Sequence, residues 1–271
     1  DAPVAQDDVG VIAEGSTLTV ANSANANVSG SYDATGEHSG DVIDTSSSSH
    51  TDSDADASSS LSITHIKLSG GSNSTVASSS SYNSNGTSIT GTYGTITIGA
   101  DGSYTYAATT DATDALDAGE SATDTFVYTL SDGTAITTAN LTITVLGAND
   151  APVAQNDVGV IAEDSTLTVS DGADANETGG SYNATGEHSG DVIDSSNTST
   201  RDTDVDVETL TVTAIRLGSS EGSGTAGTVG SALTGTYGQL TLNSNGSYSY
   251  VANQTAADAL DAGDSVTDSF N

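Results

Sequence analysis

Two runs of carboxylates at alternate positions are the residues of this sequence best suited to chemistry. The fuller run comprises Asp202, Asp204, Asp206 and Glu208, and its counterpart comprises Asp52, Asp54 and Asp56. On a loop, such spacing can converge oxygen atoms on one calcium ion, which takes oxygen ligands at about 2.3–2.6 Å. On a straight strand the same carboxylates would line one face and repel one another. The runs therefore predict calcium sites, with a solvated acidic loop as the alternative; the full EF-hand pattern is absent.

A second polar motif recurs without change. The sequence Ala-Thr-Gly-Glu-His-Ser-Gly-Asp-Val-Ile-Asp occupies 34–44 and again 184–194. One histidine cannot form a zinc site without partners, and no nucleophile elbow or oxyanion loop accompanies the serine and histidine. We expect a polar loop here, with cation ligation by Glu37, Asp41 and Asp44 as the alternative.

The composition excludes several classes of partner. There are 37 Asp and Glu residues against 3 Lys and Arg, which gives a formal charge of −34. Such a chain repels nucleic-acid phosphates and anionic lipid headgroups. Ion pairs cannot neutralise this many carboxylates, so solvent, protons or hard cations such as calcium must do so. The sequence contains no cysteine, and calcium can replace disulfides as a structural staple.

No apolar run approaches the roughly 20 residues that a membrane span requires, and the chain starts without a signal peptide. The opening residues, Asp-Ala-Pro-Val-Ala-Gln, return from Asp150 onward. Because a long period of this kind marks a tandem array, we predict two domains, 1–149 and 150–271, excised from a longer protein.

Each copy shows short alternating apolar runs separated by turn residues. Leu61–Leu68 changes phase between Ile63 and Ile66, which predicts a β-bulge. Tyr93–Ile98 and Ser103–Tyr106 flank Asp101-Gly102 and predict a hairpin with a type I′ turn. Segment 69–90 is rich in Ser, Asn and Gly, so we expect a solvent loop there.

The regular spacing of these runs predicts an all-β chain of two-sheet sandwiches. The second copy stops at Asn271, within the strand that matches Phe126. Taken alone, this copy would expose an unpaired sheet edge, to which a strand from another chain could add.

Three stretches resemble the VCBS repeat of giant bacterial RTX-type surface adhesins. They are 149–154, 202–213, and 91–106 with its continuation through 117–120 to 124–126. The resemblance implies tandem Ig-like or cadherin-like β-sandwiches that act as extracellular, calcium-loaded spacers and carry a binding tip away from the cell. Two features depart from the family pattern: 21–44 is longer than its usual connection, and serines at 58–60 leave the first acidic run poorer in ligands.

The resemblance also implies calcium between neighbouring modules. The carboxylates that would meet at such a junction are Asp150, Asp157 and Glu163, with Asp7, Asp8 and Glu14 in the first copy. Ordinary surface charge that keeps the protein soluble is the alternative for these residues.

These observations predict a non-enzymatic spacer of a long secreted adhesin or matrix protein, located outside the cell, with calcium as its cofactor and neighbouring repeats as its partners. One alternative is an extracellular filament subunit whose sheet is completed by a strand of a neighbouring chain. Another is a carbohydrate-binding module that uses its long loops, although most tyrosines fall on alternating strand positions rather than in loops.

Overall fold

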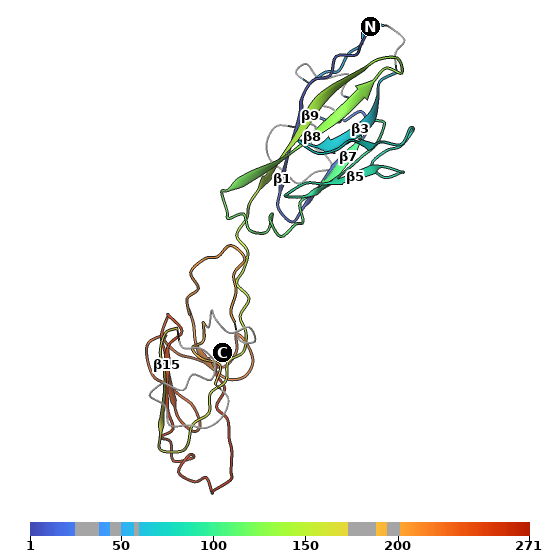
Figure 1. Ribbon diagram of the computed structural model, residues 1–271. Helices are drawn as coiled ribbons and strands as arrows, with labels where there is room; N and C mark the ends of the chain where they lie inside the picture. The colour runs from blue at the N-terminus through green and yellow to red at the C-terminus, as the bar shows by residue number, and fades with distance from the viewer. Residues whose placement is uncertain (25–37, 44–49, 57–59, 173–187, 194–200) are drawn as a thin grey trace. The chain divides into compact units, whose positions relative to one another are not determined.

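The protein is built from strands and turns (Figure 1). The computed structural model describes residues 1–24, 38–43, 50–56, 60–172, 188–193 and 201–271. The chain divides into two compact units, unit 1 (Asp1–Asp150) and unit 2 (Ala151–Asn271). The ranges described contain no helix, and so none that could cross a membrane. The prediction of an all-β chain is confirmed.

Unit 1 consists of two sheets. The larger has the order β1-β9-β8-β3-β4, and its strands are β1 (Asp8–Ala13), β3 (Ser62–Leu68), β4 (Ser74–Thr75), β8 (Ser121–Ser131) and β9 (Ile136–Leu146). The smaller has the order β2-β7-β6-β5, and its strands are β2 (Thr17–Val20), β5 (Thr87–Thr90), β6 (Thr95–Ile98) and β7 (Tyr104–Ala107). β1 runs parallel to β9, whereas the other pairs are antiparallel.

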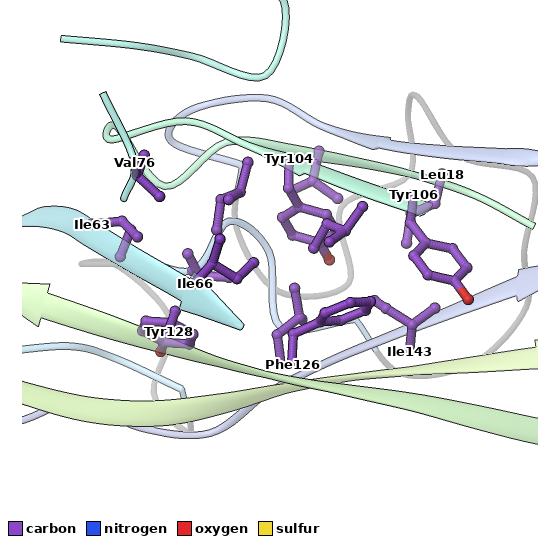
Figure 2. Packing of buried hydrophobic residues seen from close by; sticks show 14 of the residues in the cluster. Leu18, Ile63, Ile66, Val76, Tyr104, Tyr106, Phe126, Tyr128 and Ile143 are labelled. Atoms are coloured by element: carbon purple, nitrogen blue, oxygen red, sulfur yellow. The ribbon is translucent and has the colours of Figure 1, made fainter. Parts of the chain in front are cut away.

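The core of unit 1 lies between the two sheets (Figure 2). Alternate residues of β8, including Phe126 and Tyr128, point inward and are fully buried, as are Tyr104 and Tyr106 of β7. The rings of Tyr106 and Phe126 meet edge to face with their centroids 6.2 Å apart. Because each large buried side chain contributes roughly 1.5–3 kcal/mol, this alternation is what holds the sheets together.

The change of phase in β3 is a β-bulge, as predicted. The pairing of β3 with β8 shifts register between Ile63 and His65, so Ile63 and Ile66 both face the core at 1% and 0% exposure. The expected loop at 69–90 is partly wrong, because it contains β4 and β5 and buries Val76 at 4% exposure. Both are edge strands rich in Ser and Thr, so their sequences show little alternation of apolar and polar residues.

The hairpin of β6 and β7 is confirmed, but the prediction of its turn type is wrong. Only Gly102 has a positive φ, at 85°, whereas a type I′ turn needs two such residues. The amide of Gly102 donates to the Gly99 carbonyl at 3.2 Å, and the amide of Gly99 donates to the Ser103 carbonyl at 2.9 Å. The loop is therefore one residue longer than predicted. Gly102 is the last residue of the loop and has the left-handed backbone conformation.

Unit 2 reproduces part of this arrangement. One sheet has the order β10-β15-β14-β13, and a second pairs β11 with β12. Its strands are β10 (Thr166–Val169), β11 (Arg216–Leu217), β12 (Thr225–Ala226), β13 (Leu233–Thr234), β14 (Gln239–Leu242) and β15 (Tyr248–Val251). Its core is less closed: Tyr248 is 9% exposed, whereas the matching Tyr104 of unit 1 is 0% exposed.

Candidate metal centre

The fuller acidic run forms a turn that gathers three of its four carboxylates. Each of Asp204, Asp206 and Glu208 offers an oxygen atom, and the three oxygens lie within 4.8 Å of one another. The amide of Asp206 donates to Asp204 Oδ1 at 2.9 Å, and the amide of Val207 donates to the Asp204 carbonyl at 3.3 Å. The segment is thus a loop rather than a straight strand, and the side chains converge. We call these three residues the acidic triad.

The donor set of the acidic triad fits calcium. All three ligands are carboxylate oxygens, which suit hard cations. Two ligands on opposite sides of a calcium ion lie about 4.6–5.2 Å apart, or twice the usual Ca–O distance; the 4.8 Å limit of the triad is compatible with this separation. Asp204 and Asp206 are half-buried and Glu208 is exposed, which leaves one side open to water ligands. Bound calcium would neutralise the mutual repulsion of the carboxylates and tie the loop together.

The loop also carries backbone strain. Val207 has a φ of 61°, a conformation that β-branched residues rarely adopt. Its side chain is 87% exposed, so no packing contact compensates for the strain. A residue in this region costs on the order of 1–3 kcal/mol, and this cost falls within the loop that brings the three carboxylates together.

Asp202 does not belong to the triad; it anchors the loop instead. Its Oδ1 accepts the amide of Gln155 at 2.7 Å. Next to it, Val153 and Thr203 exchange backbone hydrogen bonds of 2.7 and 3.0 Å. These contacts fasten the acidic loop to the first residues of unit 2.

The counterpart run in unit 1 has the same anchor. Asp52 Oδ1 accepts the amide of Gln6 at 2.9 Å. Asp54 Oδ1 accepts the amide of Asp56 at 2.6 Å, and Asp56 Oδ2 pairs with the amino group of Asp1 at 2.5 Å. The sequence has serine where the third carboxylate of unit 2 stands, and that position lies outside the described residues. The described part of this run therefore gathers no comparable triad.

A second group of oxygens in unit 1 surrounds the hydroxyl of Tyr128. This hydroxyl donates to Asp8 Oδ2 at 2.7 Å and contacts the Gln6 carbonyl at 2.8 Å. Asp8 is 2% exposed, and its Oδ1 accepts no hydrogen bond of ordinary geometry from the described residues. Burial raises the pKa of Asp8 to about 7, although the hydroxyls of Tyr128 and Ser39 lower it. A cation beside Oδ1 would keep this carboxylate ionised.

Among the remaining predicted ligands, Asp7 binds the backbone of β9. Asp7 is exposed, and its Oδ1 accepts the backbone amide of Asn140 at 2.8 Å. Asp8 and Glu14 lie at opposite ends of β1, roughly 15–20 Å apart at the usual rise of a strand. One ion therefore cannot bind both. Asp150 ends unit 1, Asp157 is the first residue of the segment of unit 2 that matches β1, and Glu163 follows that segment.

The repeated His-Ser-Gly-Asp motif binds the backbone of β1. His38 Nδ1 accepts the amide of Val11 at 3.4 Å, and Ser39 Oγ accepts the amide of Val9 at 2.9 Å. Asp41 accepts backbone amides, including that of Ile43 at 3.1 Å. An acceptor Nδ1 requires neutral histidine, and the motif thereby holds the outer edge of β1. Glu37 and Asp44 lie outside the described residues.

The sequence interpretation missed an aspartate in each unit that binds the turn of a hairpin. Asp124 is 3% exposed and accepts the amides of Thr92, Tyr93 and Gly94 at 2.8, 3.0 and 3.2 Å. Its Oδ2 also accepts the Tyr106 hydroxyl at 2.7 Å. We call this arrangement the aspartate clamp. The sequence Gly-Thr-Tyr-Gly occurs in both copies, and an aspartate further along each copy, Asp124 or Asp268, also recurs. This shared pattern was the signal that could have indicated the clamp.

Unit 2 has the same clamp around Asp268. It accepts the amides of Thr236, Tyr237 and Gly238 at 2.8, 2.9 and 3.1 Å and the Tyr250 hydroxyl at 2.7 Å. Burial alone would raise the pKa of Asp268, but the combined hydrogen bonds outweigh burial and lower it. Burial and the same contact raise the pKa of Tyr250. The Asp268 carboxylate is thus charged, and its hydrogen bonds within the fold give it a structural role.

No protein-family model and no curated protein sequence matches the chain. Among solved structures, an endo-fucoidan hydrolase of glycoside hydrolase family 107 aligns with it at 13% identity and a TM-score of 0.25. The alignment covers 95% of this chain and 25% of the hydrolase. At this level of similarity the alignment supports no conclusion about activity.

Proposed function

We propose that the chain is a non-enzymatic spacer of a secreted bacterial surface protein, built from tandem sandwich units that calcium stiffens. The acidic triad is the observation that carries this proposal. Three carboxylates with oxygens within 4.8 Å of one another repel one another unless a cation lies among them, and calcium is the hard cation that tolerates such a flexible oxygen site.

The surroundings of the triad support a mechanical role rather than a chemical one. The loop is fastened to the first residues of unit 2 through Gln155 and Val153. An ion in the triad would therefore rigidify the segment by which the chain enters the unit. The resemblance to VCBS repeats agrees with this role, as do two strand-built units in series. Extracellular modules bind calcium with a Kd of roughly 10⁻⁴–10⁻³ M, so millimolar external calcium would fill the site.

Thermal unfolding with and without calcium tests the proposal. Calcium at about 100 times its Kd adds roughly 2.7 kcal/mol to the folded state, and we expect the Tm of unit 2 to rise accordingly. The matched control is the chain with Asp204→Asn, Asp206→Asn and Glu208→Gln, which keeps the shape of the loop and removes its charge. The proposal fails if both chains respond equally to calcium, or if neither responds.

A further inference from the structure

The first and last strands of unit 1 are neighbours that run in the same direction. β1 pairs with β9 in parallel, from Asp8 opposite Leu141 to Ala13 opposite Leu146, and the two strands are adjacent in the larger sheet (Figure 1). The other pairs among the described strands of unit 1 are antiparallel. The strand that follows the N-terminal residues of unit 1 is thus bonded directly to the strand that leads toward unit 2.

This pairing determines how unit 1 responds to tension along the chain. A pull from the N-terminal side acts on the first residue of β1. A pull from unit 2 acts on the last residue of β9, because only 147–150 separate β9 from unit 2. In parallel strands these two residues lie at opposite ends of the ladder. The two pulls therefore slide the strands past each other, and all six residue pairs resist together.

Two hydrogen bonds extend the ladder beyond the ends of β1. Before the strand, Asp7 Oδ1 accepts the amide of Asn140 at 2.8 Å. After the strand, the amide of Glu14 donates to the Leu146 carbonyl at 2.9 Å. β1 is therefore bonded to β9 along its whole length and at one residue beyond each end.

β1 is also held on its other sides. Its outer edge binds His38 and Ser39 through the amides of Val11 and Val9. On the core side, Ile12 is 0% exposed. Sliding β1 along β9 would break these outer hydrogen bonds and draw Ile12 out of the core.

β9 is anchored more firmly than β1. It pairs with β8 over 11 residue pairs, against the six that it shares with β1. Its alternate residues from Ala139 to Val145 are buried at 6% exposure or less. Under tension the contact between β1 and β9 is therefore the one that would yield first.

We propose that unit 1 resists tension along the chain, and that the parallel ladder of β1 and β9 is the element that resists it. The use of this resistance rests on the proposed spacer function, because a spacer that holds a binding tip away from a cell is pulled whenever the tip is attached. The resistance itself rests on the strand order and not on the acidic triad.

The advantage of this geometry can be expressed as a ratio of forces. A ladder peeled from one end loses one pair for every two residues of chain released, or about 6.6 Å at 3.3 Å per residue. A sheared ladder loses its six pairs within a slide of about one residue, or 3.3 Å. Shear therefore demands up to about twelve times more work per unit length than peeling.

Single-molecule pulling in optical tweezers along two directions tests the proposal. The chain has no cysteine, so a pair of introduced cysteines gives unique attachment points for DNA handles. The shear variant carries Ala2→Cys and Ala148→Cys, which place the handles at opposite ends of the ladder. The peel variant carries Ala2→Cys and Thr134→Cys, which place both handles at the end where β1 and β9 begin. All three positions are exposed.

The two variants contain the same ladder and differ only in the direction in which it is pulled. The acidic triad lies in unit 2, outside both pairs of handles, so a failure of calcium to bind there leaves the comparison unchanged. At one loading rate, we expect unit 1 to unfold at a mean force about threefold or more higher in the shear variant than in the peel variant. Equal forces in the two variants, or a higher force in the peel variant, overturn the proposal.

Discussion

Replacing Asp124 by asparagine tests whether the aspartate clamp organises unit 1. Its carboxylate accepts four hydrogen bonds of 2.7–3.2 Å at 3% exposure. Asparagine keeps one acceptor oxygen, so its best orientation retains the three hydrogen bonds at Oδ2. The NH₂ group then faces the amide of Thr92, which is also a donor.

The magnitude follows from these hydrogen bonds. A buried donor left without its acceptor costs about 1–3 kcal/mol, and each bond that changes from a charged to a neutral acceptor loses on the order of 1 kcal/mol. Because one hydrogen bond is broken and three are weakened, we expect Asp124→Asn to destabilise unit 1 by roughly 4–6 kcal/mol. Small domains have only about 5–15 kcal/mol of stability in total, so the variant would be close to unfolding.

Urea unfolding followed by circular dichroism measures the total loss of stability, and hydrogen exchange at 92–106 assigns it to unit 1. Unit 2 in the same chain is the internal control, because its own clamp is intact. The matched variant, Asp268→Asn, should cost less than Asp124→Asn because Asp268 is only half-buried. A destabilisation below about 1 kcal/mol for Asp124→Asn, or one that appears in both units, would refute the reasoning.

Three further predictions concern the clamps and the acidic loop. The pKa of Asp268 is lowered in the folded state. Its ionised carboxylate therefore stabilises unit 2 above the unfolded pKa of about 3.9, and this stability is lost as pH falls through the folded pKa. Urea melts between pH 6 and pH 2 should show that Asp268→Asn loses less stability on acidification than the unchanged chain. Gly94→Ala should prevent unit 1 from folding stably, because its Cβ would meet the Ala107 carbonyl oxygen at 2.4 Å; a normal Tm would contradict this. Val207→Gly should stabilise unit 2 by about 1 kcal/mol in EDTA by relieving the positive φ, as thermal melts can measure.

The sequence predicted those features of the fold that depend on alternation. The phase change between Ile63 and Ile66 indicated the bulge, and Asp101-Gly102 located the hairpin. The prediction from sequence failed where the turn residues were ambiguous. Asp101-Gly102 fits two turn types, and only the register of β6 and β7 shows that the loop has an extra residue. β4 and β5 were missed because short edge strands carry little apolar pattern.

The site was predicted in part for a comparable reason. Alternating carboxylates indicated a convergent loop, and the structure brings Asp204, Asp206 and Glu208 together. Spacing alone could not show that Asp202 turns away to bind the amide of Gln155. Nor could it show that Asp124 is satisfied within the fold, since its partners on 92–94 and at Tyr106 are brought to it only by the folded sheets.

Anomalous diffraction from crystals grown in millimolar calcium tests the central claim most directly. We predict an anomalous peak about 2.3–2.6 Å from oxygens of Asp204, Asp206 and Glu208. Ordered side chains at these positions that point into solvent, with no peak among them, would contradict a calcium-stiffened spacer.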